Sequence, residues 1–67
     1  MIVYINNEPR ELGEKFLIPD VLSLLAIQHT RGTAVAVNNH VVPRARWESF
    51  FLKENDKVTI IKATQGG

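Results

Sequence analysis

Apolar residues, many of them β-branched, gather in three short runs of this chain, and each run predicts a β-strand. The runs are MIVYIN, TAVAVNN and KVTIIKA, which are rich in β-branched residues and lie next to turn-forming residues. We therefore expect strands at 1–6, 33–39 and 57–63. The segment TAVAV is apolar on both faces, which is typical of a strand inside a sheet.

Two further strands are predicted from less regular patterns. Residues 10–17 follow the turn NNEP, in which Asn7 can adopt a positive φ, and Pro9 and Gly13 make the segment an irregular edge strand. NNHVVPR predicts a tight turn into a short strand that Pro43 ends. The chain therefore has four or five strands.

One segment, PDVLSLLAIQHTRG, predicts the main helix. Either Asp20 caps its start or Pro19 takes the first helical position, and Gly32 can adopt the left-handed conformation that ends it. Leu22 and Ile27 extend the apolar arc. The helix face expected to meet the core carries Val21, Leu24, Leu25 and Gln28, of which the first three are core.

A shorter segment, RARWESFFL, predicts one or two further turns of helix. Its aromatic residues recur at helical spacing. Trp47 is expected to form a satellite of the core with Phe51, one turn away.

The order of these elements is strand, strand, helix, strand, short strand, helical turn, strand. A single helix covers one face of a sheet, and its connection allows the first and last strands to pair in parallel at the centre. We therefore predict an α+β domain with the ubiquitin-like β-grasp fold, a mixed four- to five-stranded sheet with one main helix across one face. Alternation places under the helix Val3, Ile5, Val35, Val37, Val58 and Ile60. The open face takes Tyr4, Ala34, Ala36 and Ile61.

Length and composition limit the chain to one small domain. Its 67 residues, 45% of them hydrophobic, suffice for one core, so we expect a single domain over 1–67 that acts through a surface or an end. Eight lysines and arginines against seven acidic residues give a net charge of +1, which does not favour nucleic acid or membrane as a partner. Cysteine is absent, which excludes thiol chemistry. No run is long enough to cross a membrane, and we expect a cytoplasmic location.

The chain ends in IIKATQGG, and its two terminal glycines are its most distinctive chemical feature. A frayed polar terminus would account for them, and the alternative is that the terminal carboxylate is the reactive group. The imidazoles of His29 and His40 lie on different elements without carboxylate or thiol neighbours, so we expect no metal site. The chain has no glycine-rich phosphate loop, so ATP would have to be bound by a partner.

The second half of the chain carries a specific motif. An apolar strand and an asparagine are followed by a short turn, Val-Pro-Arg, two residues and a tryptophan, and then by an aspartate turn, an apolar strand and Gly-Gly. The positions are Asn38, Val42, Pro43, Arg44, Trp47, Asp56, Gly66 and Gly67. This motif resembles that of the ThiS family, the sulfur carriers of thiazole biosynthesis. Two positions depart from it: Asn55 replaces a glycine but tolerates the same left-handed conformation, and Thr64 replaces an aliphatic residue.

The resemblance implies that the chain is not an enzyme but a protein cosubstrate of thiamine biosynthesis. A ThiF-type enzyme would adenylate the carboxylate of Gly67 with ATP, and a sulfur donor such as a cysteine desulfurase would supply the sulfur of a C-terminal 1-thioglycine thiocarboxylate. A ThiG-type thiazole synthase would accept that sulfur. Thr64, Gln65 and Gly66 would thread into a partner's active site as part of a flexible tail, 64–67. The chain itself would bind no cofactor.

Ordering such a tail costs about 1–2 kcal/mol per residue, so a broader docking surface is needed. An uncovered apolar sheet face often marks an interaction site. We expect partners to bind around Tyr4, Ala36 and Ile61, while Arg44 pairs with acidic groups of a partner. The free chain is expected to be a monomer.

Two alternatives stay open. The small subunit of molybdopterin synthase ends similarly but generally lacks the Val-Pro-Arg-x-x-Trp segment, and only the acceptor enzyme would separate the two. The other alternative is a β-grasp binding module whose diglycine is incidental. PRARW sets two arginines beside Trp47, as in an RNA-binding patch, although the near-neutral charge argues against RNA.

Overall fold

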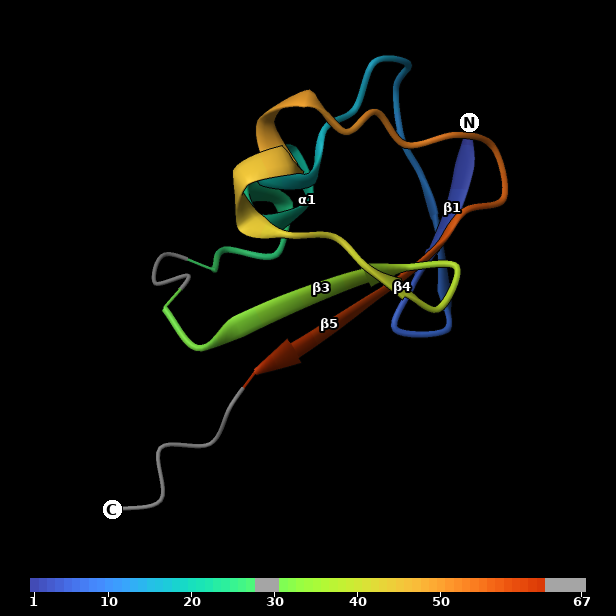
Figure 1. Ribbon diagram of the computed structural model, residues 1–67. Coiled ribbons are helices and arrows are strands. Elements are labelled where there is room, and N and C mark those ends of the chain that lie inside the picture. The colour runs from blue at the N-terminus through green and yellow to red at the C-terminus, as the bar shows by residue number, and fades with distance from the viewer. Residues whose placement is uncertain (28–30, 63–67) are drawn as a thin grey trace.

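The computed structural model describes residues 1–27 and 31–62 as a five-stranded mixed sheet with its helices on one side (Figure 1). In chain order the elements are β1 (Ile2–Ile5), β2 (Glu8–Glu11), α1 (Ile18–Leu24), β3 (Thr33–Val37), β4 (His40–Val41), the 3-10 helix η1 (Arg44–Ser49) and β5 (Lys57–Lys62). The strand order is β2-β1-β5-β3-β4. β1 and β5 are parallel, and the other neighbours are antiparallel. The predicted β-grasp topology is confirmed.

Two Asn-Asn pairs, at 6–7 and 38–39, form the turns of the two hairpins. Their φ angles are 50° and 71° in the first pair and 52° and 70° in the second. A two-residue type I′ turn requires a positive φ at both central positions, which asparagine tolerates better than most residues. Because such a turn leads straight into the returning strand, β2 begins at Glu8 and β4 at His40.

The second strand lies earlier in the chain than its pattern predicts. The sequence predicts a strand at 10–17, whereas β2 covers Glu8–Glu11 with Pro9 opposite Tyr4. This pair follows the hydrogen-bonded pair next to the turn, so the nitrogen of Pro9 faces away from β1. β2 lies at the edge of the sheet, where a missing N–H costs no ladder hydrogen bond.

The hydrophobic core lies between the sheet and α1. The six strand positions assigned to this face are confirmed, because five are at most 5% exposed and Ile60 is partly buried against them. From α1 the core takes Ile18, Val21 and Leu22. Further members of the same cluster are Leu12, Val42, Trp47 and Leu52.

The main helix is much shorter than predicted. The pattern predicts a helix over 19–32, but α1 ends at Leu24. Ala26 has a left-handed φ of 58°; its N–H donates to the carbonyl of Ser23, and the N–H of Ile27 donates to the carbonyl of Leu22. These two hydrogen bonds form a Schellman motif, which ends a helix. Gly32 does have a positive φ, of 78°, but lies beyond the helix, and Gln28 is outside the described residues.

The start of α1 and its buried face also differ from the prediction. Leu17 is the N-cap residue, and Asp20 lies at the third helical position, where its Oδ2 accepts the N–H of Leu17 at 2.9 Å. The assignment of Asp20 as N-cap is therefore wrong. The buried stripe runs through Ile18, Val21, Leu22 and, partly buried, Leu25. Leu24 falls off this stripe and is 46% exposed, so its assignment to the core is wrong.

The predicted second helical segment is the 3-10 helix η1. Trp47 is buried in the core cluster, and its Nε1–H donates to the carbonyl of Val42 at 2.9 Å. Phe51, expected to pack against Trp47, is instead 54% exposed. Because η1 ends at Ser49 and Phe50 is extended, with φ of −95° and ψ of 107°, it is Phe50 that packs against the core.

Candidate functional site

The last described strand, β5, occupies the centre of the sheet and fixes the chain up to Lys62. It pairs with β3 from Val58 to Lys62 and with β1 at Lys57 and Val58. The N–H of Ile60 also donates to Oδ1 of Asn6 at 2.9 Å. The predicted tail 64–67, with Thr64, Gln65, Gly66 and Gly67, lies outside the described residues. The sheet therefore defines the position from which the five C-terminal residues continue.

A side-chain cluster joins the β3–β4 turn to the turn before β5. Asn38 Nδ2 donates to Asp56 Oδ1 at 3.0 Å, and Asn38 Oδ1 accepts the N–H of Lys57 at 3.1 Å. The N–H of Lys53 donates to Asp56 Oδ2 at 2.8 Å. Asn55 has a φ of 69°, which confirms the left-handed conformation predicted for it. Two motif positions far apart in the sequence, Asn38 and Asp56, thus meet and hold the start of β5.

Three of the predicted docking residues share the sheet face opposite the helices. Tyr4 is opposite Lys57, Ala36 is opposite Thr59, and Ala34 is opposite Ile61, so alternation along β5 puts these pairs on one side. Ile61 is 52% exposed and Tyr4 is partly buried. Ala36 is only 8% exposed, because its short side chain lies between larger neighbours on β4 and β5.

The open face also includes a residue that the sequence analysis did not assign. Val41 pairs with Ala36 and is 68% exposed. The signal for it was the Asn-Asn turn, since a two-residue hairpin fixes which residue of β4 lies beside Ala36. With Val41, the open face extends across β1, β5, β3 and β4.

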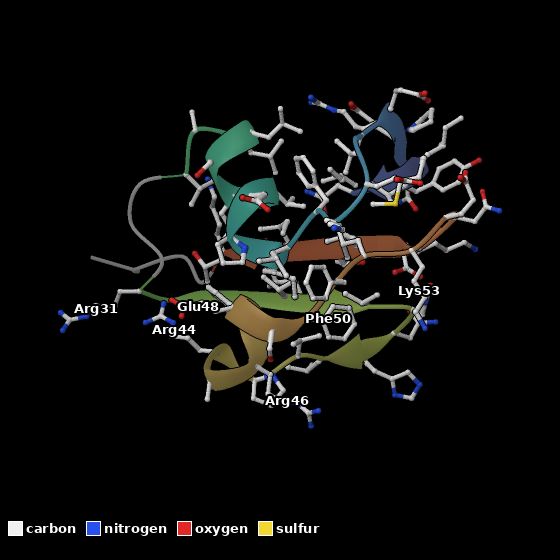
Figure 2. All side chains as sticks on the ribbon, turned by 90° about the horizontal axis from the view of Figure 1, so that it is seen from above. Arg31, Arg44, Arg46, Glu48, Phe50 and Lys53 are labelled. Atoms are coloured by element: carbon white, nitrogen blue, oxygen red, sulfur yellow. The ribbon has the colours of Figure 1, made fainter. Side chains whose placement is uncertain are left out.

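Arg44 is not on the open face. It begins η1, on the side of the sheet that carries α1, and its guanidinium carbon lies 5.2 Å from the centre of the Trp47 ring (Figure 2). A cation at this distance over an indole is attracted by the ring's negative face. The structure thus brings Tyr4, Ala36 and Ile61 together and leaves Arg44 on a separate surface.

Within residues 1–27 and 31–62, no three histidine, cysteine or acidic residues are grouped closely enough to hold a metal ion. None of the helices described there is long and apolar enough to span a membrane. His40 lies on β4, and His29 is outside the described residues.

Fold and surface together define a ubiquitin-like β-grasp domain whose final described strand is central. The model of the ThiS family matches residues 3–67. The sulfur carrier protein ThiS of Escherichia coli (strain K12) is 24% identical over 67 residues, which are all of both chains. A crystal structure of the thiamine biosynthesis protein ThiS from Geobacter metallireducens has a TM-score of 0.84 and 23% identity over all of both chains. A solution structure of a thiamine biosynthesis protein from the same organism has a TM-score of 0.81 and 23% identity, and the match covers all of this chain and 88% of that one. The chain belongs to the ThiS family.

Proposed function

We propose that the chain is a sulfur carrier of thiamine biosynthesis and that the carboxylate of Gly67 is the group that carries the sulfur. The observation that supports this most directly is the family match, which runs through the Gly-Gly end to residue 67. The relative named a sulfur carrier protein is also matched along its whole length. A carrier is a substrate of its partner enzymes rather than a catalyst, and the family implies such partners in thiamine biosynthesis.

In the proposed reaction, a ThiF-type enzyme binds ATP, and the Gly67 carboxylate attacks its α-phosphorus with loss of pyrophosphate. A persulfide, formed by a donor such as a cysteine desulfurase, displaces AMP from the acyl adenylate. A thiol then cleaves the sulfur–sulfur bond and leaves the terminal thiocarboxylate, a 1-thioglycine. A ThiG-type thiazole synthase takes the sulfur. Because ATP is consumed, we expect these steps in the cytoplasm, and the chain itself binds no cofactor.

The role proposed for residues 64–67 is to reach a partner's active site. Four extended residues span at most roughly 13–14 Å. Gly66 and Gly67 have no Cβ, so the walls of a narrow channel can approach their backbone. Thr64 and Gln65 would thread into that channel ahead of the two glycines along the chain, at its entrance.

Intact mass spectrometry tests the proposed function. The purified chain is incubated with a ThiF-type enzyme, ATP and a persulfide donor, after the enzyme has been verified on the Escherichia coli carrier. We expect the mass to rise by the difference between sulfur and oxygen, in the C-terminal peptide alone. An unchanged mass would contradict the proposal. Transfer to molybdopterin precursors but not to thiazole synthase would favour the molybdopterin alternative, which the family match does not support.

The open face is proposed as the docking surface for these partners. Ile61 lies on it one residue before the end of β5, at 52% exposure, and Tyr4, Ala36 and Val41 extend the surface across the sheet. Apolar side chains in such a position gain from leaving water when a partner covers them. The surface is continuous with the strand that leads to the tail, so one partner can hold both.

Ile61→Glu is expected to raise the KM of activation by the ThiF-type enzyme by about tenfold and leave kcat unchanged, because it places a charge in the proposed interface. Steady-state kinetics with the carrier as varied substrate measures this. Leu24→Glu is the matched control, since Leu24 is 46% exposed on α1, on the other side of the sheet. Equal KM values for both variants would place the docking surface elsewhere.

A further inference from the structure

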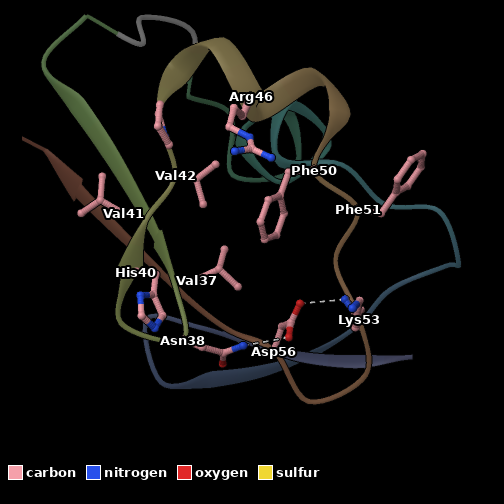
Figure 3. Close-up of a pocket in the computed structure, with 11 residues that line it drawn as sticks. Val37, Asn38, His40, Val41, Val42, Arg46, Phe50, Phe51, Lys53 and Asp56 are labelled. Atoms are coloured by element: carbon pink, nitrogen blue, oxygen red, sulfur yellow. Dashed lines mark hydrogen bonds between the residues drawn. The ribbon is translucent and has the colours of Figure 1, made fainter.

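A pocket of about 430 Å³ lies between the β3–β4 hairpin, η1 and the segment that leads from η1 to β5. The side chains of Val37, Val42 and Phe50 form its floor, and Figure 3 shows them pointing into the space. Val37 and Val42 are 5% and 6% exposed and belong to the core, so the floor is rigid. The volume is within the range of binding pockets, roughly 300–1,000 Å³.

The rim of this pocket is basic. His40, Arg46 and Lys53 stand around its mouth on three different segments (Figure 3). No ion pair joins Arg46 or Lys53 to a carboxylate of residues 1–27 and 31–62. The rim therefore presents the separated positive charges of Arg46 and Lys53 above an apolar floor.

Asp56, the acidic group among the described lining residues, is already engaged. It is 9% exposed; its Oδ1 accepts from Asn38 Nδ2 at 3.0 Å, and its Oδ2 accepts from the N–H of Lys53 at 2.8 Å. These bonds hold the turn before β5 and draw the carboxylate toward the backbone. Arg46 and Lys53 remain the side-chain charges that a bound molecule would meet at the mouth.

We propose that this pocket receives an aromatic side chain of a partner protein, flanked in that protein by acidic residues. Aromatic anchors seated in apolar pockets contribute most of the energy of many interfaces, and rim charges select and orient the partner. The cations stand on different sides of the mouth in Figure 3, which suits acidic groups before and after an anchor better than a single phosphate. Val37 faces the core, opposite to the side chain of Ala36, so the floor of the pocket lies on the other side of the sheet from the open face, and the two surfaces meet at Val41 of β4. The inference does not depend on the sulfur chemistry.

Amide chemical shifts of the isotope-labelled full chain, titrated with the capped peptide EDFDE, test this proposal. We expect saturable shifts at the lining residues and at least fivefold weaker binding of EDADE, which lacks the anchor, and of KKFKK, which reverses the charge. No shifts at the lining, or equal binding of KKFKK, would overturn the proposal. Shifts at the same amides on concentrating the chain without peptide would also overturn it, since the occupant would then be a second copy.

Charge-reversal variants localise the binding. Arg46→Glu and Lys53→Glu should each weaken the binding of EDFDE by about three- to tenfold, as expected for exposed charge pairs. Arg44→Glu is the matched control: Arg44 is also on η1 but lines the groove beside α1 and not this pocket. The affinity of the Arg44→Glu variant for EDFDE should stay within about twofold of that of the unaltered chain. Equal weakening by Arg44→Glu and Arg46→Glu would show a diffuse charge effect and contradict the assigned pocket.

Discussion

Replacing Gly66 by valine is expected to abolish formation of the thiocarboxylate and to change the free energy of unfolding by less than about 0.5 kcal/mol. A β-branched side chain widens the tail and restricts its backbone, so it would not fit a channel shaped around glycine. Stability should hold because the buried cluster of the described residues runs from Val3 to Val58. Intact mass after incubation with the ThiF-type enzyme measures activation, and urea unfolding measures stability.

Gly13→Val is the matched control for this prediction. Apart from its two chain neighbours, a Cβ at Gly13 would have no heavy atom within 4 Å, so the position has open space for a side chain. The control should be activated at the rate of the unaltered chain. Gly66→Ala should be activated at an intermediate rate, because it adds a single methyl group. A Gly66→Val variant activated as fast as the control would refute the requirement for a narrow channel.

Ile18→Ala is expected to lower the free energy of unfolding by about 2–5 kcal/mol, the range for truncating a buried aliphatic side chain. Ile18 is fully buried at the first turn of α1. The total free energy of unfolding of a folded domain is only about 5–15 kcal/mol, and a domain with a small core has a value near the low end of that range. Thermal unfolding followed by circular dichroism should show a melting temperature lowered by roughly 10 °C or more.

Leu24→Ala, on the same helix, is the control for this stability prediction. Leu24 is 46% exposed, so its truncation should cost less than about 1 kcal/mol. Ile18→Val is the milder variant to measure if Ile18→Ala does not fold, and it should lower the free energy of unfolding by about 0.5–1.5 kcal/mol. A larger loss for Leu24→Ala than for Ile18→Ala would restore the face predicted from the sequence.

The strands and their order could be predicted because period-two alternation is a local signal. The core-facing positions Val3, Val35 and Val58 were found by this rule alone. The parallel pairing of β1 with β5 follows from the one helical connection available between the two hairpins. In contrast, the start of β2 depends on the turn at Asn6 and Asn7. The residue types there favour a positive φ but do not determine which residues form the turn.

The end of α1 could not be predicted because the residue that ends it is not a glycine. Ala26 takes the left-handed position, which a residue with a Cβ adopts only at a cost of about 1–2 kcal/mol. Ile27 follows it at the position where a Schellman motif places an apolar contact, and Ile27 is packed against the core cluster. Tertiary packing therefore overrides the local preference, and the pattern overestimates the helix up to Gly32.

The candidate site was predicted in part. Alternation put Tyr4, Ala36 and Ile61 on one face, and the structure places them together there. The position of Arg44 depends on how η1 packs against α1, a contact between segments distant in sequence, so no local pattern could separate it from the other three. The pocket between Val37 and Phe50 likewise exists only once the β3–β4 hairpin and the segment before β5 are in place.

The central position of β5 affects how the protein folds while it is being synthesised. Of the described strands, the one that joins the two halves of the sheet is synthesised last, and its partners β1 and β3 have no shared neighbour until residues 57–62 are available. Contacts so distant in sequence slow folding, and the two halves of the sheet stay unjoined in a nascent chain until residues 57–62 have been synthesised. A chain interrupted before β5 lacks the centre of its sheet, so we expect it to stay unfolded and to be degraded by proteases more readily than a chain that includes β5.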